Sequence, residues 1–356
     1  MTPNVKNGLT VAAVAFAVSS TLSTAALARD QIRIVGSSTV YPFTTAVAEQ
    51  LGKAGGGKTP VVESTGTGGG LKLFCAGVGE ATPDIANASR PMKKAEFELC
   101  QANGVTDIVE IKIGLDGIVL AQAKSAPDLD LSQEELFLAL AAEVHDENLK
   151  FIPNPYKTWQ DVYPDLPAIK IEVLGPPPTS GTRDAFLELI MEKGAKGFGA
   201  LRDMKEADEK NGTKDYEKVW KSLRQDGAYV EAGENDNLIV QKIESNPNAV
   251  GIFGFSFLEE NASKIKSIKV GGVEATYESI ASGKYPGSRS LFIYVKKAHV
   301  GVIPGIKEFL AEYTSTKAVG EDGYLVKKGL IAMPKEDIEK AATTAVELTA
   351  MAAPVK

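Results

Sequence analysis

The sequence contains few of the residues that bind metal ions or act as general bases. It has only two histidines, His145 and His299, and they lie far apart in the chain. Clusters of His and Cys with the spacing of a zinc site are therefore missing. A serine nucleophile needs a neighbouring base, and neither histidine lies in such a motif. We predict that both histidines are surface residues, that the chain is not an enzyme, and that it carries no cofactor or metal.

Long hydrophobic runs are also scarce. The apolar run from Leu9 to Val18 is too short to cross a bilayer, which takes roughly 18 or more apolar residues. Lys6 precedes this run, and Ala26-Leu27-Ala28 follows it with the A-x-A pattern of a cleavage site. We predict that residues 1–28 are a signal peptide cleaved after Ala28, and that the mature chain is exported and soluble.

A surplus of positive charge is missing as well. Residues 29–356 hold 38 basic and 46 acidic side chains, a formal charge of −8. Binding of nucleic acid through a basic surface is therefore disfavoured. The same acidity removes long-range attraction of an anionic ligand, so an anion site in this chain has to rely on oriented donors at short range.

Cysteine is limited to Cys75 and Cys100. In an exported chain, one disulfide between them is the simplest interpretation, and it would stabilise the fold by about 3 kcal/mol in the chain-entropy model. Two buried free thiols are the alternative.

Apolar strand-like segments alternate with amphipathic helical ones along the mature chain. Strands are predicted at 31–35, 61–63, 108–113, 117–123, 169–174, 250–255 and 291–296, and helices at 43–51, from 71, at 131–144 and at 183–193, ending before Gly194. This order indicates an α/β fold with mainly parallel sheets, and two sheets with separate cores fit the length better than one. The charge-dense segment 203–218 is predicted to be a solvated surface excursion.

Three segments share one design, in which a strand is followed by small and hydroxyl residues and then by a helix. We call them the first loop (36–39, Gly-Ser-Ser-Thr), the second loop (64–70, Ser-Thr-Gly-Thr-Gly-Gly-Gly) and the third loop (179–182, Thr-Ser-Gly-Thr). Each places backbone N–H groups and hydroxyls at a helix N-terminus, where the helix dipole also attracts anions. Ordinary helix caps are the alternative for any one of them. Three in one exported chain favour a shared anionic ligand.

Four charged residues are candidates to choose the anion. An arginine can bind an oxyanion bidentately, which makes Arg90, Arg183 and Arg289 possible counter-charges. Asp116 accepts a hydrogen bond only from a ligand that carries a proton, as monohydrogen phosphate does and sulfate does not. An ordinary ion pair is at least as good an interpretation for Arg183 and Arg289.

A match to the nucleotide-binding phosphate loop occurs at residues 52–59, which satisfy G-x-x-x-x-G-K-[ST]. That motif needs a preceding strand and a following helix. Here a predicted helix precedes it, and Pro60 and a predicted strand follow. We interpret this segment as a surface turn.

In an ordered set of motifs the sequence resembles the periplasmic phosphate-binding proteins of ABC-type phosphate uptake systems. The match covers nearly the whole mature chain and is carried by Gly36-Ser37-Ser38-Thr39-Val40-Tyr41-Pro42, Gly66-Thr67-Gly68-Gly69-Gly70-Leu71-Lys72, Asn87-Ala88-Ser89-Arg90-Pro91, Ser180-Gly181-Thr182, Gly233-Glu234-Asn235-Asp236, Asn248-Ala249-Val250-Gly251-Ile252 and Tyr285-Pro286-Gly287-Ser288-Arg289.

The resemblance implies a two-lobed periplasmic binding protein fold of type II, with the ligand cleft between the lobes. Together with Pro127 and the turn at 285–287 as crossing points, it implies a discontinuous lobe I (29–122 plus 286–356) and an inserted lobe II (123–285). The family's ligand contacts fall on Ser38, Thr39, Thr67, Ser89, Ser180, Gly181 and Thr182.

Two positions depart from the family pattern. Many members carry an aspartate where this chain has Arg90, and an arginine where it has Pro176. We therefore expect Arg90 to supply the charge from lobe I. Asp116 is expected to take the acceptor role, pairing with Arg90 or with the proton of the phosphate.

The resemblance implies a monomeric protein that binds inorganic phosphate in the periplasm and docks on an ABC-type permease of the inner membrane. Alternatives are a binder of sulfate, molybdate or phosphonate, an exported phosphomonoesterase, and a phosphate-responsive signalling protein.

Overall fold

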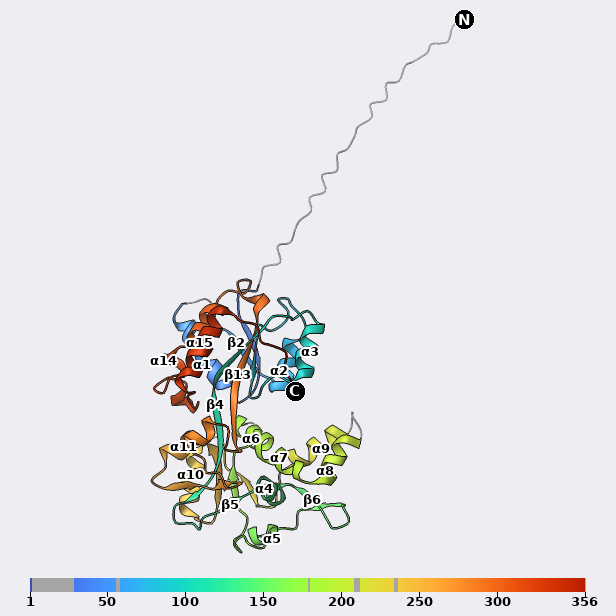
Figure 1. Cartoon of the computed structure of the whole chain (residues 1–356), viewed down its shortest axis with the longest axis vertical. Helices are drawn as coiled ribbons and strands as arrows, with labels where there is room; N and C mark the ends of the chain where they lie inside the picture. The colour runs from blue at the N-terminus through green and yellow to red at the C-terminus, as the bar shows by residue number, and fades with distance from the viewer. Residues whose placement is uncertain (2–28, 56–57, 179, 208–211, 234–235, 356) are drawn as a thin grey trace.

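The computed structural model describes Met1 and residues 29–355 apart from 56–57, 179, 208–211 and 234–235. The predicted signal peptide and its cleavage site lie outside the described residues. Two lobes stand one above the other (Figure 1), as the predicted fold class requires. Within the described part of the chain, no helix is both long and apolar enough to cross a membrane.

The strands and helices alternate as the sequence predicts. The strands are β1 (Arg33–Gly36), β2 (Val61–Ser64), β3 (Ile85–Ala88), β4 (Ile108–Ala123), β5 (Asp130–Leu131), β6 (Glu143–His145), β7 (Phe151–Pro153), β8 (Val173–Gly175), β9 (Tyr229–Glu231), β10 (Val250–Gly254), β11 (Ile265–Ser267), β12 (Lys269–Val270) and β13 (Ser288–Lys296). The helices of the upper lobe are α1 (Tyr41–Lys53), α2 (Thr67–Phe74), α3 (Lys94–Ala102), η2 (Lys297–His299), α13 (Ile306–Tyr313), α14 (Thr316–Val319), η3 (Val326–Lys328) and α15 (Lys335–Glu347). The others are α4 (Gln133–Leu140), α5 (Trp159–Val162), α6 (Gly181–Phe186), the π-helix η1 (Leu187–Met191), α7 (Glu192–Gly197), α8 (Gly199–Ala207), α9 (Gly212–Lys221), α10 (Asp236–Ser245), α11 (Phe255–Glu260) and α12 (Tyr277–Ala281).

One mixed sheet runs through both lobes. Its strand order is β2-β1-β3-β13-β4-β10-β8-β9, and β11 pairs with β4 in addition. In the upper lobe β1 is parallel to β2 and β3, and in the lower lobe β8 is parallel to β9 and β10. The antiparallel pair β4 and β13 connects the two halves (Figure 1). The exact residues at which the chain divides into lobes remain a prediction.

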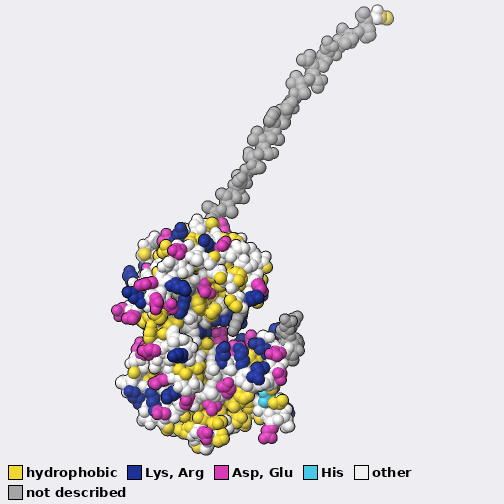
Figure 2. All heavy atoms as spheres, viewed as in Figure 1, with side chains coloured by type: hydrophobic (Ala, Val, Ile, Leu, Met, Phe, Trp, Pro, Cys, Tyr) yellow, Lys and Arg dark blue, Asp and Glu magenta, His cyan; other side chains and the backbone are white. Residues whose placement is uncertain are grey.

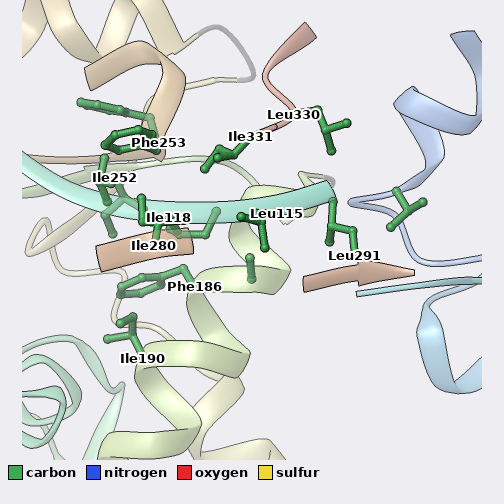
Figure 3. Close-up of a cluster of buried hydrophobic side chains, with 14 of the residues drawn as sticks. Leu115, Ile118, Phe186, Ile190, Ile252, Phe253, Ile280, Leu291, Leu330 and Ile331 are labelled. Carbon is green, nitrogen blue, oxygen red and sulfur yellow. The ribbon is translucent and has the colours of Figure 1, made fainter. Parts of the chain in front are cut away.

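Strand β4 is one continuous strand, whereas the sequence predicted two strands with a break at residues 114–116. Gly114 does not interrupt the strand, and neither does Gly117. A Cβ at Gly114 would contact the side chain of Leu330, and a Cβ at Gly117 would lie 2.8 Å from Ile280. Glycine therefore allows apolar side chains to pack directly onto the strand. Figure 3 shows Leu115 and Ile118 of β4 among these and other buried side chains.

The hydrophobic core also differs from the prediction of two separate cores. One cluster of buried side chains extends along β4 through both lobes. A second, smaller cluster lies in the upper lobe between β3 and the helices α2 and α3. It contains Cys75 and Cys100, which form the predicted disulfide. The bond thus joins the end of α2 to α3.

Two predicted helices have different ends in the structure. The helix predicted at 131–144 is α4, and it stops at Leu140 because Ala141 is extended and the chain then forms β6. The helix predicted at 183–193 continues through α6, η1 and α7 to Gly197. Gly194 does not end it. A Cβ there would clash with the backbone of Gln133, so this glycine lets α7 pack closely on α4.

Two further sequence predictions were wrong. The described part of segment 203–218 belongs to α8 and α9 and contributes Tyr216 to the core. His299 is buried rather than exposed, because it binds Asp84 inside the upper lobe. By contrast, Gly52 and Lys53 are the last residues of α1, and β2 begins at Val61, so a helix precedes the segment 52–59 and a strand follows it, which is not the order of a nucleotide-binding loop.

Candidate anion-binding site

The first loop, the second loop and Ser89 meet at one edge of the sheet. Gly36, the last residue of β1, pairs with Ser64 of β2 and Asn87 of β3. Because the three strands are parallel, their carboxyl ends place the segments that follow side by side. A Cβ at Gly70 would lie 2.4 Å from Cα of Gly36, so glycine lets helix α2 start directly against the first loop.

Thr67 and Ser89 form a buried hydroxyl pair. The oxygen of Thr67 accepts a hydrogen bond from the backbone N–H of Ser89 at 3.2 Å, and the two hydroxyl oxygens are 3.1 Å apart. Neither hydroxyl caps a helix, since the N-cap of α2 is Gly66. The interpretation of these residues as ordinary helix caps therefore does not apply to this pair.

The third loop reaches across from the lower lobe and touches the first loop. Thr39 Oγ1 donates to the carbonyl of Gly181 at 3.2 Å, and Ser38 Oγ donates to Asp184 Oδ2 at 2.6 Å. A Cβ at Gly181 would lie 2.9 Å from both N and Cα of Thr39, closer than real side chains approach a backbone. Glycine at 181 is therefore what permits this contact between the lobes.

Two hydroxyls in these loops accept from the backbone of their own segment. Ser180 is the N-cap of α6, and its oxygen accepts from the N–H of Thr182 at 3.2 Å. Ser37 accepts from the N–H of Val40 at 3.4 Å. Thr179 lies outside the described residues. The hydroxyls of Ser38 and Thr39, by contrast, are turned toward the lower lobe.

Arg289 is the residue around which the two lobes are joined. Its guanidinium donates to Thr39 Oγ1 at 2.7 Å, to Asp116 Oδ2 at 3.0 Å and to Glu188 Oε2 at 2.9 Å. Arg289 and Asp116 are paired residues of β13 and β4, and their side chains are only 6% and 15% exposed. Glu188 comes from the lower lobe and is 43% exposed. The interpretation of Arg289 as an interdomain ion pair is thus confirmed.

Arg90 forms a separate ion pair within the upper lobe. Its two terminal nitrogens bind the carboxylate of Glu96 at 2.8 and 2.9 Å, so the expected pairing of Arg90 with Asp116 is not formed. Burial opposes both charges, but the hydrogen bonds and the attraction between the two charges together outweigh it. The pKa of Arg90 is therefore raised and the pKa of Glu96 is lowered. Both groups are charged at neutral pH.

Arg183 lies behind the third loop. It donates to the carbonyl of Pro176 at 3.1 Å, and its guanidinium carbon lies 4.5 Å from the ring centroid of Tyr229. Glu231 approaches to 3.9 Å. Burial raises the pKa of Tyr229 to about 12. Arg183 lines a different cavity, of 400 Å³, in the lower lobe.

A cavity of 860 Å³ opens next to the joined loops. Its lining includes Ser89 and Arg90 of the predicted ligand residues, together with Gly68, Glu188 and Arg289. The other predicted residues do not line it, and of these Ser38, Thr39 and Gly181 form the contact between the lobes. The structure therefore brings the predicted residues to one region between the lobes, but with different exposure to the cavity.

Sequence reasoning missed three carboxylates at this site, Glu96, Asp184 and Glu188. Acidic residues near an anion site run against the expected charge, so the sequence offers no direct signal for them. Asp184 and Glu188 do stand four residues apart on the helix that follows the third loop, which places them on one face. In the residues that the structure describes, no cluster of His, Cys, Asp or Glu could hold a metal ion.

Comparison with known proteins places this geometry in a family. A family model described as a PBP superfamily domain matches residues 21–317. Protein SphX of Synechocystis sp. is 33% identical over 317 residues, which cover 86% of this chain and 79% of that protein. The phosphate-binding protein PstS of Staphylococcus saprophyticus is 30% identical over 308 residues, which cover 85% and 80%.

The solved structures agree. The crystal structure of a possible phosphate binding protein from Planctomyces limnophilus has a TM-score of 0.70 and 30% identity, covering 89% of this chain and 98% of that one. The resemblance that the sequence motifs indicated is confirmed. The chain belongs to the PBP superfamily and is similar to the SphX and PstS proteins.

Proposed function

We propose that this chain binds inorganic phosphate between its two lobes in the periplasm and delivers it to an ABC-type permease, without chemical turnover. Relatives that match most of the chain are named for phosphate binding. We further propose that the mature protein begins after Ala28 and acts as a monomer. The ligand set is Ser38, Thr39, Thr67, Ser89, Arg90, Asp116, Ser180, Gly181 and Thr182.

The observation that carries this proposal is the meeting of the hydroxyl-rich loops across the lobes. Thr39 of the upper lobe contacts Gly181 of the lower lobe, while Thr67 and Ser89 lie at the same sheet edge. An anion held here would receive donors from both lobes at once. Its binding energy would therefore favour the closed arrangement over an open one.

The carboxylates at the site support an oxyanion as the ligand. Ser38 donates to the carboxylate of Asp184, and Arg90 holds the carboxylate of Glu96 with two parallel hydrogen bonds. A phosphate oxygen has the same acceptor character as a carboxylate oxygen. Phosphate would then replace these internal acceptors, so that the binding equilibrium includes the release of Asp184 and Glu96.

The two departures from the family pattern also fit an oxyanion. Pro176 stands where many members have an arginine, yet Arg183 places its guanidinium against the carbonyl of Pro176. A positive charge thus remains beside the third loop. Asp116 is fixed by Arg289, which leaves its second oxygen as the acceptor for a ligand proton. This arrangement would favour monohydrogen phosphate over sulfate.

Isothermal titration calorimetry with phosphate at pH 6, 7 and 8, with sulfate as competitor, tests the proposal. We expect tight one-to-one phosphate binding that sulfate displaces poorly. Gly181→Val should weaken binding at least tenfold, because the added side chain holds the third loop away from Thr39. Gly254→Ala is the matched control, since a Cβ there meets only Ser256 Oγ at 3.9 Å.

Three outcomes would contradict the proposal. Equal affinity for phosphate and sulfate would assign the site to oxyanions in general. Preference for molybdate or a phosphonate would assign it to that ligand. Turnover of a chromogenic phosphate ester by the purified protein would make it an exported phosphomonoesterase.

A further inference from the structure

The cavity next to the site continues into a basic groove on the lower lobe. The 860 Å³ cavity and a neighbouring one of 640 Å³ share Lys196, Lys205, Thr213 and Tyr216 in their linings. We call the combined surface the lysine groove. Its lining holds eight lysines and arginines and five glutamates, in a chain whose overall charge is −7. Figure 2 shows Lys and Arg side chains gathered on the lower lobe beside the gap between the lobes.

Four of the five glutamates that line the groove form ion pairs with basic residues of the groove. Glu192 binds Lys196 and Glu217 binds Lys221, each at 2.7 Å and one helical turn apart. The other two pairs, Arg90 with Glu96 and Arg289 with Glu188, are those of the candidate site. The excess positive charge therefore rests on the basic residues outside these pairs.

Three lysines outside these pairs stand on both walls of the groove. Lys93 precedes α3 in the upper lobe, while Lys193 of α7 and Lys205 of α8 belong to the lower lobe. Lys93 and Lys193 are exposed and form no ion pair with any residue that the structure describes. The ammonium of Lys205 lies 5.2 Å from the ring centroid of Tyr216. The cavity that these lysines line also reaches Ser89.

We propose that the lysine groove is an outer binding surface that captures phosphate and similar small oxyanions and guides them to the loops between the lobes. This inference rests on the proposed function. A net acidic chain repels an anion at long range, so a local positive field on the approach route is needed for fast capture. A cleft lined by charge of one sign focuses that field and raises association rates by about 10- to 1,000-fold.

The groove acts on the approach of the ligand and not on its final contacts. Lys93, Lys193 and Lys205 make no hydrogen bond to any residue of the loops in the part of the chain that the structure describes. Removing their charge should therefore slow association and leave dissociation nearly unchanged. The effect should also fade with salt, because the Debye length falls from about 10 Å at 0.1 M to about 3 Å at 1 M ionic strength.

Stopped-flow fluorescence of the full mature protein tests this proposal, with inorganic phosphate as the probe. Trp220 lines the groove and, with Trp159, provides the signal. At low ionic strength, the triple variant Lys93→Gln, Lys193→Gln, Lys205→Gln should associate about tenfold more slowly than wild type. The dissociation rate constant should stay within about twofold, and the difference should vanish near 1 M salt. The corresponding triple Lys→Arg variant should keep the wild-type rate.

A control variant separates local from overall charge. Lys327→Gln, Lys328→Gln and Lys340→Gln together remove the same charge from η3 and α15, outside the groove, and should leave the rate unchanged. An equal fall in this control would overturn the inference, as would an unchanged rate in the groove variant. Failure of wild type to bind phosphate by calorimetry would overturn the proposed function and the inference together. Binding with a groove-independent rate would overturn the inference alone.

Discussion

The two ends of strand β3 carry charged clusters that differ in burial and in where their partners come from. At the amino end, Asp84 is fully buried, and its partners Arg29 and His299 belong to the same lobe. At the carboxyl end, beyond Ser89, Arg90 and Arg289 each pair with carboxylates that are partly exposed, and one of these, Glu188, belongs to the other lobe.

In the cluster around Asp84, both carboxylate oxygens have partners. Its carboxylate accepts from Arg29 at 2.6 Å, from the N–H of Arg33 at 2.7 Å and from Nδ1 of His299 at 2.6 Å. Nε2 of His299 accepts from the N–H of Gly79 at 3.2 Å, which leaves Nδ1 as the nitrogen that donates to Asp84. Asp84, Arg29 and His299 each have a fixed partner inside the lobe, and the Asp84 carboxylate leaves no room for a ligand.

The carboxylates at the cleft are more exposed than Asp84. Under the proposed function, a bound anion would displace them, because they are only partly buried. Arginines and carboxylates thus have different roles at the two ends of β3. Burial makes them structural at one end of β3. Under the proposed function, partial exposure and partners from both lobes would make them available to a ligand at the other end.

The largest effect, on the free energy of unfolding, is expected when a substitution disrupts the buried cluster around Asp84. Asp84→Asn would leave the charge of Arg29 uncompensated and upset the hydrogen bonding of His299, so we expect the free energy of unfolding to fall by about 3–5 kcal/mol. Urea unfolding followed by circular dichroism measures it. Glu80→Gln, which alters an exposed partner of the backbone of Arg29, should cost under about 0.5 kcal/mol. A loss below about 1 kcal/mol for Asp84→Asn would remove the structural role assigned to this cluster.

The next effect tests the cleft. Under the proposed function, Asp116→Asn replaces the carboxylate that would accept a ligand proton with a neutral amide, so the preference for phosphate over sulfate should fall by at least tenfold in competition calorimetry. Glu188→Gln is the matched control, because it removes the other carboxylate on Arg289 and should keep the preference. An unchanged ratio of affinities in Asp116→Asn would show that Asp116 does not select the ligand.

The smallest effect concerns pH. Burial lowers the pKa of Lys296 to about 8, although Asp84 opposes the shift. Between pH 8 and the ordinary lysine value near 10.4, the unfolded chain binds more protons at this residue than the folded one, so its contribution to stability rises with pH. Lys296→Met should flatten that rise in urea unfolding measured from pH 7.5 to 10. Parallel pH curves for the two proteins would contradict the lowered pKa.

Local sequence patterns predicted the parts of the site that depend on neighbouring residues. The hydroxyl-rich loops follow strands and precede helices, so their place at a sheet edge could be read directly. Pairings between distant segments could not. Arg289 and Asp116 meet because β13 and β4 pair in register, and no local pattern encodes that register. The burial of His299 escaped prediction for the same reason, since its partner stands 215 residues away.

The roles of several glycines differ between the sequence prediction and the structure. Gly114 stood outside the predicted strands and Gly194 marked a predicted helix end, yet each lies inside a strand or helix where a neighbour packs against the backbone. A glycine that ends an element and one that admits close packing look alike in sequence. Only the three-dimensional neighbour distinguishes them.

The disulfide has a consequence for how the protein must be made. Cys75 follows helix α2, which begins at Thr67 of the second loop, and Cys100 lies on α3, which also carries Glu96, the partner of Arg90. The disulfide therefore links the helix that carries the Thr67 hydroxyl to the helix that carries Glu96. Protein prepared in a reducing cytosol would lack this disulfide. If the proposed function is right, such protein would bind anions with a different affinity from the oxidised protein.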